Sequence, residues 1–243
     1  MSEKEHRYLR YGIGYGVVCV SILIVVLLIL SGTKKEEAGE KEMSKVMQPV
    51  ELPQEPGQEP KKIALTFDDG PHPVYTEQML EVLDENQVPA TFFLLGQNIE
   101  GHEEVVKEIA EKGHLIGNHT FHHVQITGMS AEQAYEEIDQ TSRLIEELTG
   151  KGTEYVRPPF GTWNTGLESE LDLIPVMWTI DTKDWTTENV DAIVNHVVKN
   201  AGENDIILMH DSYKSTVEAT ERIIKLLKAE GFEFVTVDEV VMD

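Results

Sequence analysis

Apolar residues near the start of the chain form one long run without charges. Residues 11–33 contain no Asp, Glu, Lys or Arg, and their centre at 17–30 is almost purely aliphatic. A helix of this length can cross a hydrocarbon layer about 30 Å thick. The pattern therefore predicts a single transmembrane helix at 11–33, after a short cytoplasmic tail at 1–10. The alternative is a cleaved signal peptide, which we disfavour because no clear small-x-small cleavage site follows Leu30.

The next segment, 34–60, shows no apolar periodicity. It alternates Lys and Glu and then becomes rich in Pro, Gln and Glu. A chain of this composition cannot bury enough apolar surface to offset the entropy that folding costs. We predict that 34–60 is a flexible acidic and Pro-rich linker.

From residue 61 to the end, short apolar runs alternate with amphipathic segments. Strand-like runs occupy 61–67, 90–96, 114–118, 155–159, 175–181, 205–211 and 232–238. Helical patterns begin near residues 75, 103, 130, 187 and 217. The pattern at 130 starts with a Ser cap, runs to Leu148 and stops at Gly150. About seven βα units predict an α/β fold with a parallel sheet, and that many most naturally close into a barrel. We assign 61–243 to this one domain.

Composition narrows the partners and the chemistry. The 44 Asp and Glu residues against 20 Lys and Arg give a formal net charge of −24, which repels nucleic acid phosphates. The single cysteine, Cys19, lies in the apolar N-terminal run, so the domain has no disulfide and no thiol. A metal site in the domain must therefore use His, Asp and Glu.

Charged and polar residues concentrate just after the predicted strands. In barrels of parallel strands this is where active sites are built. Five of the seven predicted strands end in such a cluster: TFDDGP at 66–71, HTFHH at 119–123, RPPFG at 157–161, DTKDW at 181–185 and LMHD at 208–211. The sequence thus predicts an active site that several strand ends share.

Two histidines in these clusters have the spacing of a ligand pair. His119 and His123 lie four residues apart, which on one helical turn directs both imidazoles the same way. A carboxylate from another strand end would complete the set, and we choose Asp69. Three protein ligands leave one position open, as in catalytic zinc sites. We expect His122 to point away.

Each of these residues also has an ordinary structural explanation. Asp68 and Asp69 could belong to a solvated turn, because Asp-Gly-Pro is turn chemistry. Arg157 could form a structural ion pair, and Trp185 could belong to the core. The order in which the clusters follow successive strands favours the functional interpretation.

The motifs together resemble the polysaccharide deacetylases, also called the NodB homology domain or carbohydrate esterase family 4. All five family motifs are present between residues 61 and 243, as TFDDGP, HTFHH, RPPF, DTKDW and LMH. The resemblance implies a distorted barrel of about seven βα units. It also implies one divalent metal ion, usually Zn²⁺, with Co²⁺, Mn²⁺ or Ni²⁺ as alternatives. Phe160 and Met209 stand where Tyr and Leu are commoner in the family.

The resemblance also implies roles for the residues that match the motifs. Asp69, His119 and His123 correspond to the metal ligands. Asp68 corresponds to the general base that takes a proton from water, and His210 to the general acid that protonates the departing amine.

The remaining motif residues correspond to supporting positions. The backbone N–H of Phe160 would face the oxyanion, and Arg157 would orient Asp68. A carboxylate should keep His210 cationic; Asp181 is our first candidate and Asp184 the alternative, and either could stand behind Arg157. The substrate pocket would be lined by Trp185, Pro158 and Leu208.

These implications predict a metal-dependent N-deacetylase, a hydrolase of linear amide C–N bonds, that acts on peptidoglycan GlcNAc or MurNAc and releases acetate. Alternatives within the family are a chitooligosaccharide deacetylase and an O-acetyl-xylan esterase. A non-catalytic wall-sugar-binding homologue is disfavoured because Asp68 and His210 are both present. A zinc peptidase is disfavoured because His-Glu-x-x-His is absent.

Location follows from the predicted function rather than from charge. Lys and Arg lie on both sides of residues 11–33, so the positive-inside rule does not decide the orientation. A wall substrate requires the domain to lie outside the cell membrane of a bacterium, held by a single-pass anchor. We expect the protein to act as a monomer.

Overall fold

The centre of the fold is a sheet whose strand pairs are all parallel. The structure, a computed structural model, describes residues 60–163 and 172–241. The sheet order is β5-β4-β3-β2-β1-β7-β6, and β8 also pairs with β1. The strands are β1 (Lys61–Asp68), β2 (Thr91–Leu94), β3 (Leu115–Asn118), β4 (Tyr155–Val156), β5 (Ile174–Pro175), β6 (Ile180–Asp181), β7 (Asp205–His210) and β8 (Phe232–Val235).

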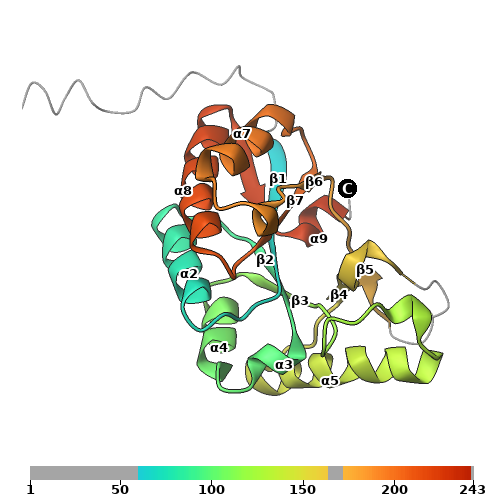
Figure 1. Cartoon of the computed structure of the whole chain (residues 1–243). Helices are drawn as coiled ribbons and strands as arrows, with labels where there is room; N and C mark the ends of the chain where they lie inside the picture. Colours follow the sequence, from blue (N-terminus) through green and yellow to red (C-terminus); the bar gives the residue numbers. More distant parts are fainter. Residues whose placement is uncertain (1–59, 164–171, 242–243) are drawn as a thin grey trace, which may run out of the picture. The chain divides into compact units, whose positions relative to one another are not determined.

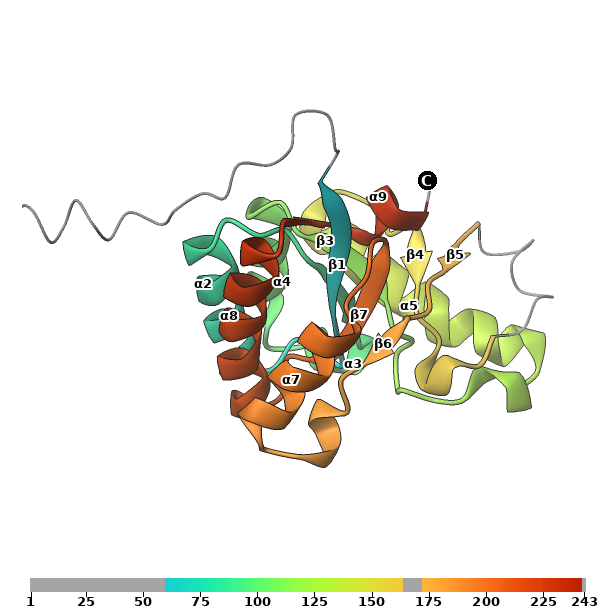
Figure 2. The ribbon, with the colours of Figure 1, turned by 90° about the horizontal axis from the view of Figure 1, so that it is seen from above.

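Helices connect the strands and cover the sheet. They are α2 (Tyr75–Glu85), α3 (Gly96–Ile99), α4 (Glu103–Glu111), α5 (Ala131–Thr149), α7 (Val190–Asn200), α8 (Lys214–Ala229) and α9 (Val237–Val241). Short 3-10 turns are η1 (Ile126–Gly128), η2 (Pro159–Gly161) and η3 (Asp184–Thr186). Helices α2, α4, α7 and α8 pack with β1 in one apolar core, to one side of the strands (Figures 1 and 2). Helix α9 packs on the other side, against β1 and β7.

The alternation of β1 decides which of its side chains reach the site. Ile63, Leu65 and Phe67 face the core shared with α2 and α8. Since successive side chains of a strand point to opposite faces, Thr66 and Asp68 point the other way, into the hollow of the curled sheet. Both are buried, and both contact Arg157 there.

Residues 175–181 do not form one strand, so this prediction is wrong. The predicted strand is split into β5 and β6, which lie at opposite ends of the strand order. The backbone N–H of Val176 bonds the carbonyl of Val156 in β4 (2.8 Å), and that of Thr179 bonds Ile206 in β7 (2.9 Å). One short segment therefore connects the two edges of the sheet, which curls into a half-barrel. The part of the chain that the structure describes has eight strands where seven were predicted.

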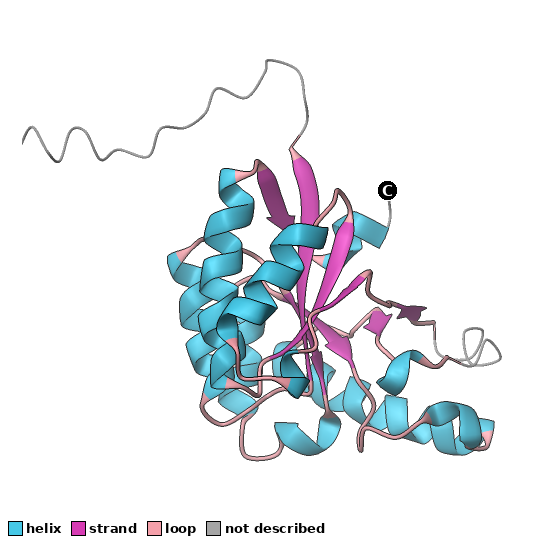
Figure 3. Cartoon of the chain, turned by 45° about the horizontal axis from the view of Figure 1, so that its top comes forward, coloured by secondary structure: helices cyan, strands magenta, loops and turns pink. Residues whose placement is uncertain are grey.

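Most other predicted elements are confirmed, with shifted ends. Ser130 and Gln133 form a capping box at the start of α5, and Gly150 ends that helix in a left-handed conformation (φ 70°). The predicted strand 232–238 is too long, because β8 ends at Val235 and α9 begins two residues later. Figure 3 shows the resulting arrangement of helices and strands.

The predicted tail at 1–10, anchor at 11–33 and linker at 34–60 lie outside the described residues, apart from Pro60. Within residues 60–163 and 172–241, none of the helices is both long and apolar enough to span a bilayer.

Buried His114 predicts a loss of stability in acid. Its Nδ1 accepts a hydrogen bond from the N–H of Ala90 (3.2 Å), and burial lowers the pKa of His114 to about 4. In the unfolded chain the pKa of His114 returns to about 6.5. The stability that the neutral, buried imidazole contributes is therefore complete above pH 6.5 and is lost as the pH falls towards 4. We expect His114 by itself to lower the free energy of unfolding by about 3 kcal/mol over this window.

Urea unfolding followed by tryptophan fluorescence measures this loss. His114→Asn should be less stable than the wild type at neutral pH, and the difference between the two should shrink as the pH falls from 6.5 to 4. His196→Asn, at an exposed position of α7, is the control and should follow the wild type. Equal slopes for wild type and His114→Asn would contradict the assignment.

Candidate active site and metal centre

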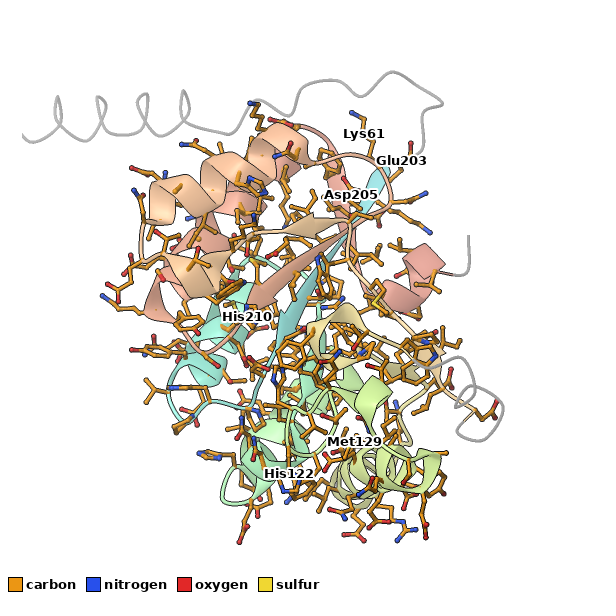
Figure 4. All side chains as sticks on the ribbon, turned by 45° about the vertical axis from the view of Figure 1, so that its right-hand side comes forward. Lys61, His122, Met129, Glu203, Asp205 and His210 are labelled. Carbon is orange, nitrogen blue, oxygen red and sulfur yellow. The ribbon has the colours of Figure 1, made fainter. Side chains whose placement is uncertain are left out.

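The predicted site residues gather where β1, β3, β4 and β7 end. Asp68 and His210 are paired neighbours in the register of β1 and β7, so one lies beside the other across the ladder. His210 lies at the end of β7 opposite to Asp205, and Lys61 marks the opposite end of β1 (Figure 4). The carboxyl ends of the strands thus bring together residues that are far apart in the sequence.

Asp69, His119 and His123 form a cluster that could hold a metal ion. One ligand atom from each lies within 4.8 Å of the others. Asp69 Oδ1 is 3.5 Å from the Nε2 atoms of both histidines. Residues 119–123 are not helical, so the helical turn assumed from the spacing is wrong. Instead, positive φ angles at Thr120 (67°) and His123 (56°) fold the loop back towards Asp69.

The structure gives two independent signs that this cluster fits a cation. Asp69 Oδ1 is buried and has no hydrogen-bond partner among the described residues, which is costly unless a positive group meets it. His119 Nδ1 contacts the carbonyl of Arg157 (2.6 Å), which leaves Nε2 free to serve as ligand. Burial is the main cause that lowers the pKa of His119, and a neutral imidazole is the form that binds metals.

Asp68 is held by a buried arginine. Arg157 is fully buried, and its Nη1 donates to Asp68 Oδ1 (2.8 Å) and to Thr66 Oγ1 (2.6 Å). Its Nε donates to the carbonyl of Val176 (3.1 Å) and Nη2 to that of Met177 (3.3 Å). The prediction that Arg157 contacts Asp68 is therefore met. The carboxylate expected behind it is replaced by these backbone carbonyls.

His210 is paired with Asp184 and not with Asp181, so our first candidate is wrong. His210 Nδ1 lies 2.8 Å from Asp184 Oδ1, and Asp184 Oδ2 accepts from the N–H of His210 (2.7 Å) and from Thr216 Oγ1 (2.8 Å). Asp181 instead accepts from the N–H of Lys183 (2.9 Å), a residue with φ 56°. This left-handed turn directs Asp184 inwards and leaves Asp181 at the end of β6.

The pair with Asp184 changes the proton affinity of His210. Burial alone would lower the pKa of the imidazole. The hydrogen bond and charge of Asp184, with the charges of Asp68 and Asp69, outweigh burial and raise the pKa to about 9. His210 is therefore cationic at neutral pH, with its Nε2 4.0 Å from Asp69 Oδ2.

The other predicted residues differ in exposure. Phe160 is 64% exposed, has φ 60°, and its ring lies 4.9 Å from that of His123. Trp185 is 56% exposed beside Asp184, so it does not belong to the core. Pro158 and Leu208 are buried, and the Leu208 carbonyl accepts a bond from Thr182 Oγ1 (2.9 Å).

Sequence reasoning missed a buried carboxylate beside the site. Asp211 accepts a hydrogen bond from Thr76 Oγ1, and burial raises the pKa of Asp211 to about 7. A side chain at Gly70 would place its Cβ 2.6 Å from Asp211 Oδ2, so glycine is required there. The only signal in the sequence was an acid directly after His210.

Comparisons with known proteins show which family the chain resembles. The family model described as polysaccharide deacetylase matches residues 55–175. The chain is 37% identical over 192 residues to the Bacillus subtilis peptidoglycan N-acetylmuramic acid deacetylase PdaC, covering 78% of this chain and 41% of that protein. It is 39% identical over 187 residues to a Bacillus cereus peptidoglycan N-acetylglucosamine deacetylase, covering 74% and 87%.

Two further comparisons concern a chitooligosaccharide deacetylase and a solved structure. The chain is 40% identical over 161 residues to a chitooligosaccharide deacetylase of Rhizobium leguminosarum bv. trifolii, covering 65% of this chain and 74% of that protein. The solved structure of Bacillus subtilis PdaC matches with a TM-score of 0.73 and 36% identity, covering 78% of this chain and 93% of that structure. The chain spans less than half the length of the whole Bacillus subtilis protein.

The cluster predicts which histidines hold a metal ion. His119→Ala and His123→Ala should each lose most of the bound divalent metal, because each removes one of three ligands. Elemental analysis of the purified full-length protein measures the metal content. His122→Ala is the matched control, since His122 is exposed and pairs with Glu137 (2.9 Å). Full metal content in both ligand variants would refute the assignment.

Proposed function

We propose that this chain, which belongs to the polysaccharide deacetylase family, is a metal-dependent hydrolase that removes acetyl groups from an N-acetylated cell-wall polysaccharide and releases acetate. One observation carries the proposal. Asp68 and His210 are each paired with a residue of opposite charge, and each lies within 4.0 Å of a member of the Asp69, His119 and His123 cluster. This places an acceptor and a donor of protons beside one candidate metal centre.

The metal would be held by Asp69, His119 and His123. A set of one carboxylate and two imidazoles suits Zn²⁺, which we prefer, with Co²⁺, Mn²⁺ or Ni²⁺ as alternatives. A divalent cation bound there supplies Lewis acidity that polarises a carbonyl oxygen and acidifies water. All remaining steps are assigned to side chains and backbone groups of the chain itself.

Asp68 is the general base. Its carboxylate takes a proton from the water that attacks the acetamide carbonyl carbon. Arg157 fixes the position of this carboxylate and balances its charge. The backbone N–H of Phe160 is assigned to the oxyanion that develops on the carbonyl oxygen, since residue 160 lies beside His123.

His210 is the general acid. As an imidazolium paired with Asp184, it donates a proton to the amide nitrogen as the C–N bond breaks. The products are acetate and a free amine on the sugar. Trp185 is assigned to the wall of the pocket because it is exposed beside Asp184, with Pro158 and Leu208 beneath.

Peptidoglycan GlcNAc or MurNAc is the preferred substrate, because two relatives are named for these reactions. A chitooligosaccharide is the second candidate, on the similarity to the Rhizobium enzyme. An O-acetyl-xylan esterase is a third alternative within the family. A non-catalytic sugar-binding role is disfavoured, because Asp68 and His210 both retain charge partners.

We further propose that residues 11–33 anchor the protein in a bacterial cell membrane and that the domain acts outside it as a monomer. Protease added to intact cells with permeabilised walls should then release the domain by cleavage within 34–60. The acidic, Pro-rich composition of that segment makes it accessible. Protection of the domain until the membrane is lysed would exclude this topology.

The function predicts acetate release that depends on Asp184. With purified peptidoglycan, chitooligosaccharides and acetylated xylan assayed in parallel, we expect the highest kcat/KM on peptidoglycan. Asp184→Asn should lower kcat/KM by about 10²-fold or more, because it removes the charge that keeps His210 protonated.

Asp181→Asn is the matched control. Within the described residues the Asp181 side chain bonds only the N–H of Lys183, so this variant should stay near the wild-type rate. Retained metal content shows that each variant is folded. A larger loss for Asp181→Asn than for Asp184→Asn would reverse the assignment, and no acetate from any substrate would reject the function.

A further inference from the structure

The short helix α3 contacts both loops that carry the candidate metal ligands. It follows β2 after one residue, Leu95 (Figure 1). From this helix, Asn98 donates a hydrogen bond through Nδ2 to the backbone carbonyl of Asp69 (2.8 Å). We propose that Asn98 is a positioning residue of the metal cluster, an inference that rests on the metal centre of the proposed function. Its amide holds Asp69 where this carboxylate can share one metal ion with His119 and His123.

Asp69 depends on support from outside its own side chain. Its φ of 70° is a left-handed conformation, which residues other than glycine keep only where their surroundings enforce it. Its Oδ1 lies 3.5 Å from the Nε2 atoms of His119 and His123. In the described part of the chain this oxygen has no hydrogen-bond partner. The backbone at residue 69 therefore decides where the ligand oxygen lies.

The segment that follows β2 supplies this support at two successive carbonyls. The N–H of Leu95 donates to the carbonyl of Gly70 (2.9 Å), and Asn98 Nδ2 donates to that of Asp69. Because both carbonyls are held, the turn at residue 69 cannot change its dihedral angles without the loss of a hydrogen bond.

The same segment also holds the loop of the two histidines. The N–H of Gly96 donates to the carbonyl of Thr120 (3.1 Å), and the N–H of Gln97 donates to that of Phe121 (3.1 Å). Both acceptors lie between the two histidine ligands in the sequence. Residues 95–98 thus bond two carbonyls of each ligand loop, so this segment sets the separation of the loops.

Asn98 is itself held in place before any metal binds. Its N–H donates to the carbonyl of Leu95 (3.0 Å), and its carbonyl lies 3.0 Å from His102 Nδ1. Helix α3 also packs closely on α5, because a Cβ at Gly96 would lie 2.4 Å from Thr141 Oγ1. The Asn98 amide therefore starts from a fixed backbone and loses little further freedom in its bond to the turn.

The affinity for Zn²⁺ tests the role of Asn98, because this bond is made by a side chain and a substitution can remove it. The metal-free full-length protein is titrated with Zn²⁺ alone, in competition with a chromophoric chelator. Asn98→Ala removes the amide, and Asn98→Leu removes it but keeps the size of the side chain. Both should weaken the affinity about tenfold or more, as loss of a group that orients a metal ligand typically does.

Asn86→Ala is the matched control. Asn86 is half-buried like Asn98, and its Nδ2 also donates to a backbone carbonyl, that of Val82 (2.8 Å), at the end of α2. This variant should bind Zn²⁺ as the wild type does. Urea unfolding of the metal-free proteins should show that the Asn98 variants are folded and about as stable as Asn86→Ala.

Wild-type affinity in either folded Asn98 variant, or an equal loss in Asn86→Ala, would overturn this role of Asn98 and leave the proposed function standing. Failure of both Asn98 variants to fold would make Asn98 a residue of the fold as a whole, and would also overturn its role at the metal. A folded wild-type protein that binds no Zn²⁺ would reject the metal centre of the proposed function and the role of Asn98 together.

Discussion

The buried ion pair between Arg157 and Asp68 is the interaction on which the rest of the site depends. Its two residues lie 89 positions apart in the chain: Asp68 ends β1, and Arg157 directly follows β4. Neither charge can be left without the other, because removal of one partner from a buried pair costs about 3–5 kcal/mol. The remaining donors of Arg157 hold the carbonyls of Val176 and Met177, the segment that joins the two edges of the sheet. The same residue also offers its own carbonyl to His119 Nδ1. The path of the segment that joins the two edges, the position of the proposed base Asp68 and the orientation of the candidate ligand His119 thus depend on one side chain and its backbone.

The sheet also makes the proposed acid and the proposed base neighbours, and gives each a partner of opposite charge. The register of β1 and β7 places Asp68 beside His210. A shift of one residue would turn either side chain to the opposite face, into the apolar core. Arg157 balances the charge of Asp68, whereas Asp184 raises the pKa of His210 to about 9. The two side chains therefore lie side by side, each with a partner of opposite charge, as the proposed pairing of a base with an acid requires.

Backbone strain is concentrated around this pair. Of the eight non-glycine residues with positive φ in the described part of the chain, five belong to the clusters after the strands: Asp69, Thr120, His123, Phe160 and Lys183. Such conformations cost about 1–3 kcal/mol each and persist only where the surroundings enforce them. Those at Asp69, Thr120 and His123 lie where a carboxylate and two imidazoles come together in the candidate metal cluster. The stable sheet offsets this cost, which is consistent with a site selected for chemistry rather than for stability.

The sequence alone determined the alternation of strands and helices, the caps of α5, and the set of strand ends at which polar residues meet. It could do so because these features depend on local periodicity and on neighbours a few residues away. Only the tertiary structure decided that His210 pairs with Asp184 and not with Asp181. It also decided that 175–181 connects the two edges of the sheet. His119 and His123 come together through a loop rather than a helix. Each of these depends on a turn whose dihedral angles are fixed by distant contacts, such as those of Asp184 with Thr216 and of Arg157 with Val176. Spacing in the chain carries no record of such contacts. A left-handed residue such as Lys183 changes the path of the backbone, and so changes where the next side chains point.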